Sequence, residues 1–231
     1  MNSWIVVPAA GVGHRFGGDI PKQYQQLLGK TVIEHTLERL LKLENTQIVV
    51  AVGQTDILWQ QLPVFQNPRI QTIKGGEERA DSVRLALEHI QGKAEQDDWV
   101  LVHDVARPCV RVRDIQNLMT TLANHKVGGV LATPVSDTLK RVLKQKDIAS
   151  TKDRSQLWAA QTPQMFRYGL LSKSLQSAAQ DHWQPTDESA AIERLGYTPQ
   201  VVEGSRDNIK ITRSEDMAIA AAIMTYQQEQ E

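Results

Sequence analysis

A glycine-rich loop followed by a lysine is the part of this sequence with the clearest chemical potential. Residues 8–18 have small side chains at positions 9 to 11 and glycines at 11, 13, 17 and 18. Backbone N–H groups in such a loop can surround an anion, because no side chain keeps the anion away. Arg15 lies within the loop and Lys22 follows it, so one cation can chelate phosphate oxygens while the other acts as a mobile point charge. A flexible turn is the simpler interpretation of the loop alone, but the two cations favour a triphosphate site.

A dinucleotide-binding fold is the main alternative, since Gly11-x-Gly13 is half of the GxGxxG fingerprint. Position 16 is Phe where the fingerprint requires Gly, and Pro21 interrupts the segment in which the pyrophosphate-binding helix would run. The second expected strand ends in Val52-Gly53-Gln54, which offers no carboxylate to a ribose. A nicotinamide or flavin cofactor is therefore less favoured than a nucleoside triphosphate.

Two further segments could complete a nucleotide site. Residues 75–82 form a second small-residue turn at the start of an expected helix and offer backbone groups and the Ser82 hydroxyl to a planar ligand. A capping serine is the simpler explanation of that turn taken alone.

Asp104 ends a buried strand, where an acid points into the ligand crevice. One carboxylate together with phosphate and water oxygens is a common Mg²⁺ site. Asp104 could instead cap the next turn and pair with Arg107.

Lys210 lies in residues 208–212, which we expect to form a β-branched strand. A lysine with apolar neighbours on both sides is either an edge-strand residue that discourages aggregation or a cation directed into a site. Thr162, Thr186 and Arg154 could add hydroxyl and guanidinium groups, although none of the three stands out on its own.

Other catalytic chemistries find no support in the sequence. The six histidines lack metal-binding spacing, the HExxH and GxSxG patterns are absent, and Cys109 has no adjacent base. A single cysteine also excludes an intrachain disulfide and any multi-cysteine metal site. A triphosphate loop beside a Mg²⁺ carboxylate instead predicts nucleotidyl transfer, which needs charge neutralisation and alignment more than a protein nucleophile.

Composition limits the partners and the location of the protein. The 231 residues include 26 Lys and Arg against 27 Asp and Glu, for a formal net charge of −1. Such a balance gives no general attraction to nucleic acid or to an anionic membrane, so any anion site must be local. No apolar run approaches the ~18 residues that cross a bilayer, and residues 1–8 lack the features of a signal peptide. We therefore expect a cytoplasmic protein with a single domain over residues 1–231.

The elements that must position these residues alternate between short β-branched runs and amphipathic stretches, which is typical of an α/β protein. Strands are expected at residues 5–7, 47–52, 69–73, 99–102 and 129–135. Helices are expected at residues 31–43, from Asp81 and Ser82 to 90, at 114–125, from Thr186 to 195, and from Ser214 onwards. The continuous apolar strands predict a mostly parallel central sheet covered by helices on both faces.

The sequence pattern of residues 136–161 differs from that of these strands and helices. Residues 137–143 alternate as a strand would, and a turn-like segment at 144–147 leads to a second extended piece. A polar hairpin of this kind has too little apolar surface to be stable alone. We expect it to project from the main body as an arm and to pack against a second copy of the chain in a homodimer.

In combination these segments resemble the 2-C-methyl-D-erythritol 4-phosphate cytidylyltransferases, the CTP-using enzymes of the non-mevalonate isoprenoid route. The matching stretches run in family order and cover nearly the whole chain: 8–15, 21–24, 75–82 (family pattern GGxxRxxSV), 102–108 (VHDxARP), 137–138, 162–164, 186–188 and 207–212. The resemblance implies a Rossmann-like nucleotidyltransferase (GT-A-like) fold in which residues 136–161 form the dimerisation arm. It also implies Mg²⁺-assisted transfer of the cytidylyl group of CTP to 2-C-methyl-D-erythritol 4-phosphate, a branched polyol phosphate, with release of pyrophosphate.

The resemblance further implies roles for individual residues. Those that would contact the cytosine and ribose are Ala9, Ala10, Gly11, Gly76, Glu77 and Ser82, while Gly13, Arg15 and Lys22 would hold the triphosphate. Asp104 would bind Mg²⁺. The polyol phosphate site would contain Asp104, Ala106, Arg107, Thr162, Thr186 and Lys210, with Thr138 and Arg154 reaching in from the arm of the partner. The catalytic cations would be Arg15, Lys22, Lys210 and Arg154.

Two residues depart from the family pattern, Glu77 where Asp is common and Val105 where Ala is common. Glu77 could shift a contact near the nucleotide, and Val105 adds bulk beside Asp104. A sister family that uses ribitol 5-phosphate shares most of the nucleotide-binding motifs and is the alternative for the acceptor. A nucleotide-binding module without catalysis is the alternative from another class, which the intact cations and Asp104 disfavour.

Overall fold

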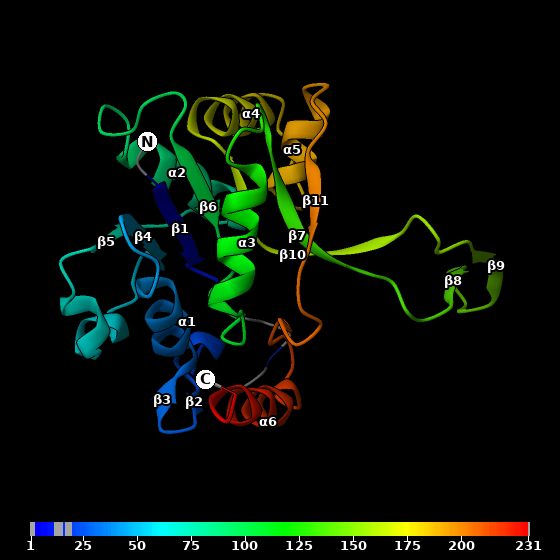
Figure 1. Ribbon diagram of the computed structural model, residues 1–231, viewed down its shortest axis with the longest axis horizontal. Helices are drawn as coiled ribbons and strands as arrows, with labels where there is room; N and C mark the ends of the chain where they lie inside the picture. The colour runs from blue at the N-terminus through cyan, green and yellow to red at the C-terminus, as the bar shows by residue number, and fades with distance from the viewer. Residues whose placement is uncertain (1–2, 12–15, 17–19, 231) are drawn as a thin grey trace.

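A twisted sheet of seven strands forms the centre of the computed structural model, which describes residues 3–11, 16 and 20–230 (Figure 1). The strand order is β11-β7-β10-β6-β1-β4-β5. In chain order the strands are β1 (Ser3–Ala9), β4 (Thr46–Val52), β5 (Ile70–Lys74), β6 (Trp99–Val102), β7 (Gly128–Pro134), β10 (Trp158–Arg167) and β11 (Gln200–Glu203). Only β10, among the strands of this sheet, runs antiparallel to its neighbours. The prediction of a mostly parallel α/β sheet is therefore confirmed.

Helices cover both faces of the sheet. The α-helices are α1 (Val32–Leu41), α2 (Arg79–His89), α3 (Val112–Leu122), α4 (Tyr168–Gln180), α5 (Glu188–Arg194) and α6 (Asp216–Gln228). The body also contains short elements: β2 (Gln26–Leu27), β3 (Lys30–Thr31), and the 3-10 turns η1 (Lys22–Tyr24), η2 (Leu58–Gln61) and η3 (Pro63–Gln66). None of the helices in the described part of the chain has the length and apolar character needed to span a bilayer.

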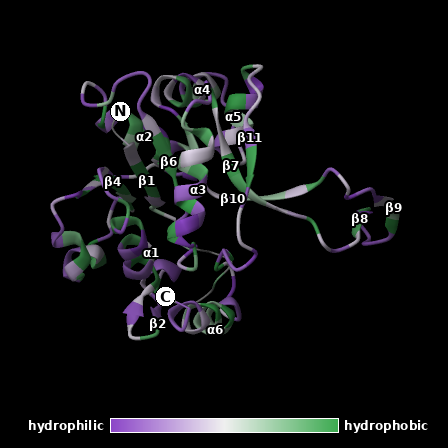
Figure 2. Cartoon of the chain, viewed as in Figure 1, coloured by the Kyte–Doolittle hydropathy of each residue, from purple (hydrophilic) through white to green (hydrophobic). Residues whose placement is uncertain are grey.

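The side chains of β1 explain why this strand reads as a continuous apolar run. Ile5 and Val7 pack on one face of the sheet with α1 and α3, whereas Trp4 and Val6 pack on the other face with α2, α4 and α5. Because successive side chains of a strand point to opposite faces, a strand covered on both sides needs apolar residues at every position. Helix α3 buries Ile115, Leu118 and Leu122, and its outward surface is hydrophilic in Figure 2.

All five predicted helix starts differ from the observed ones by one or two residues, and α3, expected from residue 114, begins at Val112. Helix α2 begins at Arg79, so Asp81 and Ser82 lie inside its first turn, where the Asp81 carboxylate accepts from the N–H of Glu78 at 3.3 Å. Asp187, rather than Thr186, caps α5 and accepts from the N–H of Ala190 at 2.9 Å. Helix α6 begins at Asp216, two residues after Ser214. At α2 and α5 a neighbouring carboxylate therefore accepts an N–H group at the helix start.

The segment expected to form a strand at residues 208–212 has no regular structure, so that prediction is wrong. Its N–H at Ile211 donates to the carbonyl of Ala106 at 2.8 Å, outside any sheet ladder. The buried side chain of Ile211 packs in a third apolar cluster with Leu27, Val32, Ala106, Cys109, Ala220 and Met224. Packing against α6 therefore places this segment beside the end of β6, and Lys210 with it.

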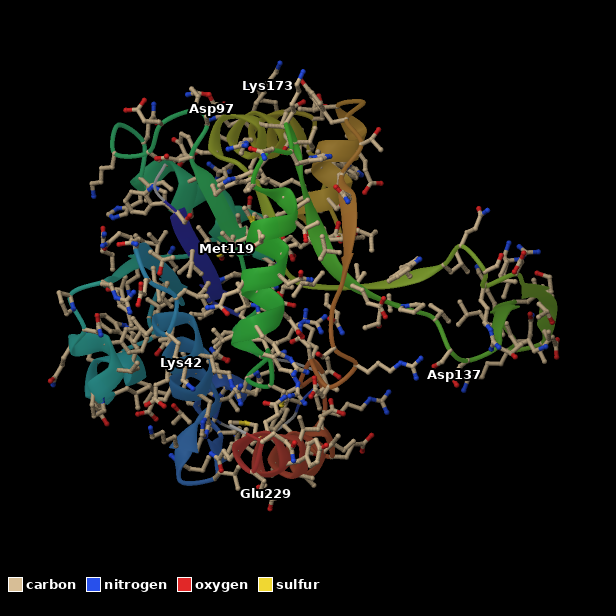
Figure 3. The ribbon with its side chains drawn as sticks, viewed as in Figure 1. Lys42, Asp97, Met119, Asp137, Lys173 and Glu229 are labelled. Carbon is tan, nitrogen blue, oxygen red and sulfur yellow. The ribbon has the colours of Figure 1, made fainter. Side chains whose placement is uncertain are left out.

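The arm is a two-stranded hairpin of β8 (Leu139–Val142) and β9 (Ile148–Lys152) that extends away from the body (Figure 1). Asp137 lies on the connection leading into it (Figure 3). Strand β10 already begins at Trp158, opposite Pro134 of β7, so residues 158–161 of the expected arm belong to the central sheet. The hairpin exposes apolar side chains, including Val142 at 55% and Ile148 at 64%.

Candidate active site

A cleft of about 560 Å³ lies at the carboxyl ends of β1 and β6. Segments that are far apart in the sequence line it: Pro8–Gly11, Lys22, Gln23, Gly76–Arg79, Ser82, Asp104–Ala106 and Lys210. The structure thus brings together Ala9, Ala10, Gly11, Lys22, Gly76, Glu77, Ser82, Asp104, Ala106 and Lys210 of the predicted site residues. Gly13 and Arg15, the other two predicted from the first loop, lie outside the described residues.

The turn at Gly75 and Gly76 is built for close contact with the first loop. The N–H of Gly75 donates to the carbonyl of Val52 at 2.8 Å, and a Cβ at Gly75 would lie 2.6 Å from the Cβ of Ala10. The N–H of Gly76 donates to the hydroxyl oxygen of Ser82 at 3.2 Å. Ser82, buried at 1% exposure, therefore braces the turn and is not a helix cap.

Lys22 and Gln23 connect the first loop to the rest of the cleft. The Nζ of Lys22 donates to the carbonyl of Ile211 at 3.1 Å, next to Lys210 in the sequence. Gln23 is buried, and its Nε2 donates to the carbonyl of Ala9 at 3.0 Å. The Oε1 of Gln23 has no hydrogen-bond partner within the described chain, which leaves a buried acceptor at the wall of the cleft.

Asp104 is the centre of a cluster of charges. Its Oδ1 accepts from Nε of Arg79 at 2.8 Å, while its Oδ2 lies 2.9 Å from Nζ of Lys210 and 3.5 Å from Nε of Arg107. Burial alone would raise the pKa of Asp104, but the attraction of Arg79, Lys210 and Arg107 outweighs it and holds the pKa well below its usual range. Asp104 is therefore an ionised carboxylate at neutral pH.

Asp104 has the donor chemistry that Mg²⁺ prefers, a hard, fully ionised carboxylate oxygen at the edge of a cleft. The described residues contain no group of three or more acidic, His or Cys side chains that could hold a metal ion by themselves. A magnesium ion here would need phosphate and water oxygens for most of its ligands. It would also have to displace Lys210 and Arg107 from Oδ2.

The backbone of Asp104 is held by a chain of hydrogen bonds. Its N–H donates to Oγ1 of Thr162 at 3.0 Å, and Oγ1 lies 3.2 Å from Nδ1 of His103. Nε2 of His103 lies 3.2 Å from the carbonyl of Arg107. Burial, partly offset by Asp104, lowers the pKa of His103 to about 4, so the ring is neutral. We assign the proton to Nε2, which donates to Arg107, while Nδ1 accepts from Thr162.

A second cavity of about 430 Å³ adjoins the first across the same charged cluster. It shares Arg79, Asp104 and Lys210 with the first cleft and is also lined by Arg107, Ala160, Gln161, Thr162, Gln164, Thr186 and Asp187. Five of the six residues expected within the chain to meet the polyol phosphate line this cavity, namely Asp104, Arg107, Thr162, Thr186 and Lys210, whereas the sixth, Ala106, lines only the first cleft. The two cavities therefore offer adjacent sites for two anionic ligands, with cations between them.

Thr138 and Arg154 do not lie at either cavity within one chain. Both are exposed on the arm, and the Arg154 guanidinium donates to the carbonyl of Ser136.

Arg79 and Glu188 are members of the cluster that the sequence reasoning missed. Arg79 contacts Asp104 and both carboxylate oxygens of Glu188, at 2.7 and 3.0 Å. The position of Arg79 in the sequence, four residues after Gly75 of the second glycine turn, could have indicated that it belongs to the site. For Glu188 the sequence shows only an acidic residue at the start of a helix, because its partner Arg79 comes from a distant helix.

Comparison with known proteins agrees with this geometry. The family model for IspD, 2-C-methyl-D-erythritol 4-phosphate cytidylyltransferase, matches residues 3–226. Proteins of that name from Hahella chejuensis and Vibrio vulnificus are 47% and 49% identical over 218 and 216 residues, covering 94% and 93% of this chain and 90% and 91% of theirs.

Solved structures lead to the same family. The crystal structure of 2-C-methyl-D-erythritol 4-phosphate cytidylyltransferase (IspD) from Francisella tularensis superposes with a TM-score of 0.84 at 37% identity, covering 96% of this chain and 100% of that one. The bifunctional IspDF from Campylobacter jejuni gives a TM-score of 0.77 at 27% identity, covering 95% of this chain and 54% of that one. This chain belongs to the 2-C-methyl-D-erythritol 4-phosphate cytidylyltransferase (IspD) family.

Proposed function

We propose that this protein transfers the cytidylyl group of CTP to 2-C-methyl-D-erythritol 4-phosphate, with release of pyrophosphate. The observation that carries the proposal is the pair of adjoining cavities that share Arg79, Asp104 and Lys210. CTP occupies the first cleft, lined by small residues of the first loop, and the polyol phosphate occupies the second cavity. Family membership supports both substrates. Because a nucleoside triphosphate does not cross membranes unaided, we place this activity in the cytoplasm.

The reaction is an in-line displacement at phosphorus. A phosphate oxygen of the acceptor attacks the α-phosphorus of CTP, a new P–O bond forms on that side, and the bond to the pyrophosphate oxygen breaks on the other. Two anions must approach each other, so the main task of the protein is to neutralise and align them. Lys210 lies between the cavities and Lys22 at the wall of the first, where their charges stabilise the transition state. We assign the same task to Arg15.

Asp104 is the residue that would hold Mg²⁺, which supplies charge neutralisation on the phosphates when bound. A carboxylate that is always ionised and has exchangeable partners fits this role. Lys210 and Arg107 would leave Asp104 for the phosphates of the substrates. Thr162 would hold the Asp104 backbone through its hydroxyl as well as lining the acceptor cavity.

The arm joins two copies of the chain into a homodimer and carries Thr138 and Arg154 into the acceptor cavity of the partner. A lone two-stranded hairpin is marginal in water, and this one exposes Leu139, Val142, Leu143 and Ile148. Burial of those side chains against a second copy would stabilise the hairpin. Arg154 would add a further catalytic cation to each site.

A coupled pyrophosphate-release assay tests the proposed function. The protein is incubated with Mg²⁺, one of four nucleoside triphosphates and either 2-C-methyl-D-erythritol 4-phosphate or ribitol 5-phosphate. Release that requires both CTP and the branched acceptor is expected. Turnover with ribitol 5-phosphate alone would move the protein to the other acceptor class, and CTP binding without turnover of either acceptor would indicate a non-catalytic nucleotide-binding module.

A further inference from the structure

We propose that Glu188 is a positioning residue that acts through Arg79 on the carboxylate of Asp104. The Glu188 side chain is the first of α5 and is 1% exposed. Its Oε1 and Oε2 accept from Nη1 and Nη2 of Arg79 at 2.7 and 3.0 Å, while Nε of the same guanidinium donates to Oδ1 of Asp104 at 2.8 Å. The guanidinium thus bridges two carboxylates, one in the cleft and one beneath it.

Arg79 differs from the other two cations around Asp104 in how firmly it is held. Bidentate guanidinium–carboxylate pairs fix geometry as well as charge, and Arg79 makes such a pair with a buried partner. Lys210 has a single 2.9 Å contact with Asp104 and a side chain that is 35% exposed, and the Arg107 contact is 3.5 Å. Lys210 can therefore move from Asp104 to a substrate phosphate, whereas Arg79 remains with the protein. Arg107 is also held by a 2.7 Å hydrogen bond from its Nη1 to the carbonyl of Asn208, so it can lose only its long contact with Asp104.

Glu188 is itself tied to the central sheet. Asp187, its neighbour, accepts from Nε2 of Gln164 at 2.9 Å, and Oε1 of Gln164 accepts from the N–H of Ser189 at 2.9 Å. Gln164 is a buried residue of β10 that pairs with Val102, two residues before Asp104. Strand β10 thus holds both the start of α5 and the end of β6. It therefore fixes the distance between Glu188 and Asp104, which Arg79 spans.

Removal of the Glu188 charge would leave Arg79 with Asp104 as its only anion in the cluster. The guanidinium could then turn and cover both Asp104 oxygens, including Oδ2, from which Lys210 must depart. Asp104 would keep its backbone position, because Thr162 and His103 hold it independently. This inference rests on the proposed role of Asp104 as the metal-binding carboxylate.

Four variants test it: Glu188→Gln, Arg79→Gln, the double variant, and Glu193→Gln as the matched control. Glu193 is an exposed acid on the same helix, so its loss removes the same charge without touching Arg79. We expect Glu188→Gln to lower kcat by about 10–100-fold, as loss of an outer-shell partner does, with KM for CTP nearly unchanged. The double variant should be no slower than Arg79→Gln, and Glu193→Gln should match wild type.

Calorimetric titration with CTP, with and without Mg²⁺, gives a readout that does not depend on turnover. The gain in CTP affinity on adding Mg²⁺ should shrink by about 10-fold in Glu188→Gln and stay at the wild-type value in Glu193→Gln. If Glu188→Gln melts below the assay temperature, Glu188→Asp, which keeps the charge on a shorter side chain, should show an intermediate loss of the same gain.

Three results would overturn the proposal. The first is a folded Glu188→Gln protein with the wild-type kcat and the wild-type gain in CTP affinity on adding Mg²⁺. The second is a Glu188→Asp protein with the wild-type gain in affinity. The third is a double variant in which the two losses multiply, because independent losses mean that Glu188 does not act through Arg79. A wild-type protein that binds CTP but turns over no acceptor would count against the proposed function. In that case the effect of Mg²⁺ on CTP affinity in the Glu188 variants would still test the role of Glu188.

Discussion

The amino group of Lys210 lies 2.9 Å from Oδ2 of Asp104, although the two residues come from opposite halves of the chain. Lys210, a cation of the proposed acceptor site, thus contacts Asp104, the proposed metal ligand, before any substrate is bound. In the proposed reaction Lys210 would leave Asp104 for a substrate phosphate, and the carboxylate of Asp104 would then be available to hold Mg²⁺.

Asp104→Asn should separate nucleotide binding from catalysis. The variant keeps the size of the side chain and removes a negative charge from a cleft lined by Arg79, Lys22 and Lys210. CTP binding in the absence of Mg²⁺ should therefore be as tight as in wild type or tighter, while turnover with Mg²⁺ falls by at least about 100-fold. Calorimetry without metal and the pyrophosphate assay measure the two quantities. Weaker metal-free binding of CTP would mean that Asp104 supports the nucleotide by another route.

Lys22→Ala should remove charge stabilisation that is felt mostly in the transition state. We expect turnover to fall by a factor that corresponds to about 2–4 kcal/mol, with folding intact. Lys93→Ala, a change at an exposed lysine outside both cavities, serves as the control for charge alone. Near-normal kcat in Lys22→Ala would refute the role assigned to this residue.

His103 should make the folded protein lose stability in mild acid. Its pKa of about 4 in the fold, due mainly to burial, lies below the ordinary value of 6.5, so between these two values the unfolded chain binds a proton that the folded chain does not. The free energy of unfolding should fall by about 3 kcal/mol as the pH drops from 6.5 to 4, and the contribution is fully present above pH 6.5. Urea unfolding across this range measures it.

His103→Asn should remove that part of the pH dependence. His182→Asn, a change at an exposed histidine whose backbone has a φ of 51°, should leave it in place. An equal loss of pH dependence in both variants would show that His103 is not the group responsible.

Cys109 should be inert in the folded protein. Burial raises the pKa of its thiol to about 12, although Arg39 opposes the shift, and the sulfur lies 3.7 Å from the carbonyl of Ala220 in α6. At pH 8 only about 10⁻⁴ of the thiol is ionised. Iodoacetamide followed by mass spectrometry should therefore find no adduct on the native chain and one on the urea-unfolded chain. Rapid native labelling would show that α6 does not cover this site.

Mixed dimers test the contribution of the arm. A dimer with Lys22→Ala in one chain and Arg154→Ala in the other has one site with both changes and one intact site. Such a dimer, purified through two different tags, should recover about half of the wild-type activity. A dimer with Lys22→Ala in both chains is the inactive control. An inactive mixed dimer would show that each site is built within one chain.

Much of the fold is predictable because burial on two faces leaves a strong pattern. Strands β1, β4 and β6 are apolar at nearly every position, and only a parallel sheet covered on both sides requires this. The antiparallel β10 was not predicted, since Pro163 interrupts its pattern and its direction depends on pairing with β6 and β7. Residues 208–212 carry a strand-like pattern, but the apolar side chain of Ile211 packs against α6.

The candidate site is predictable only where its residues stand at recognisable places in the sequence. Asp104 follows an apolar strand and Lys22 follows a glycine loop, and both line the cleft as expected. Arg79 and Glu188 could not be paired from the sequence, because the contact depends on how α2 and α5 pack on the same face of the sheet. Only the hydrogen bonds that Arg79 makes to both carboxylates in the fold reveal the relation of Arg79 and Glu188 to Asp104.

Crystallography of the protein with a non-hydrolysable CTP analogue and Mg²⁺ would test the site most directly. Cytosine should lie against the turn at Gly76 and Ser82, the phosphates between Lys22 and Lys210, and the metal ion on Oδ2 of Asp104 with Lys210 withdrawn from it. A nucleotide bound elsewhere, or an empty cleft at saturating ligand, would contradict the account.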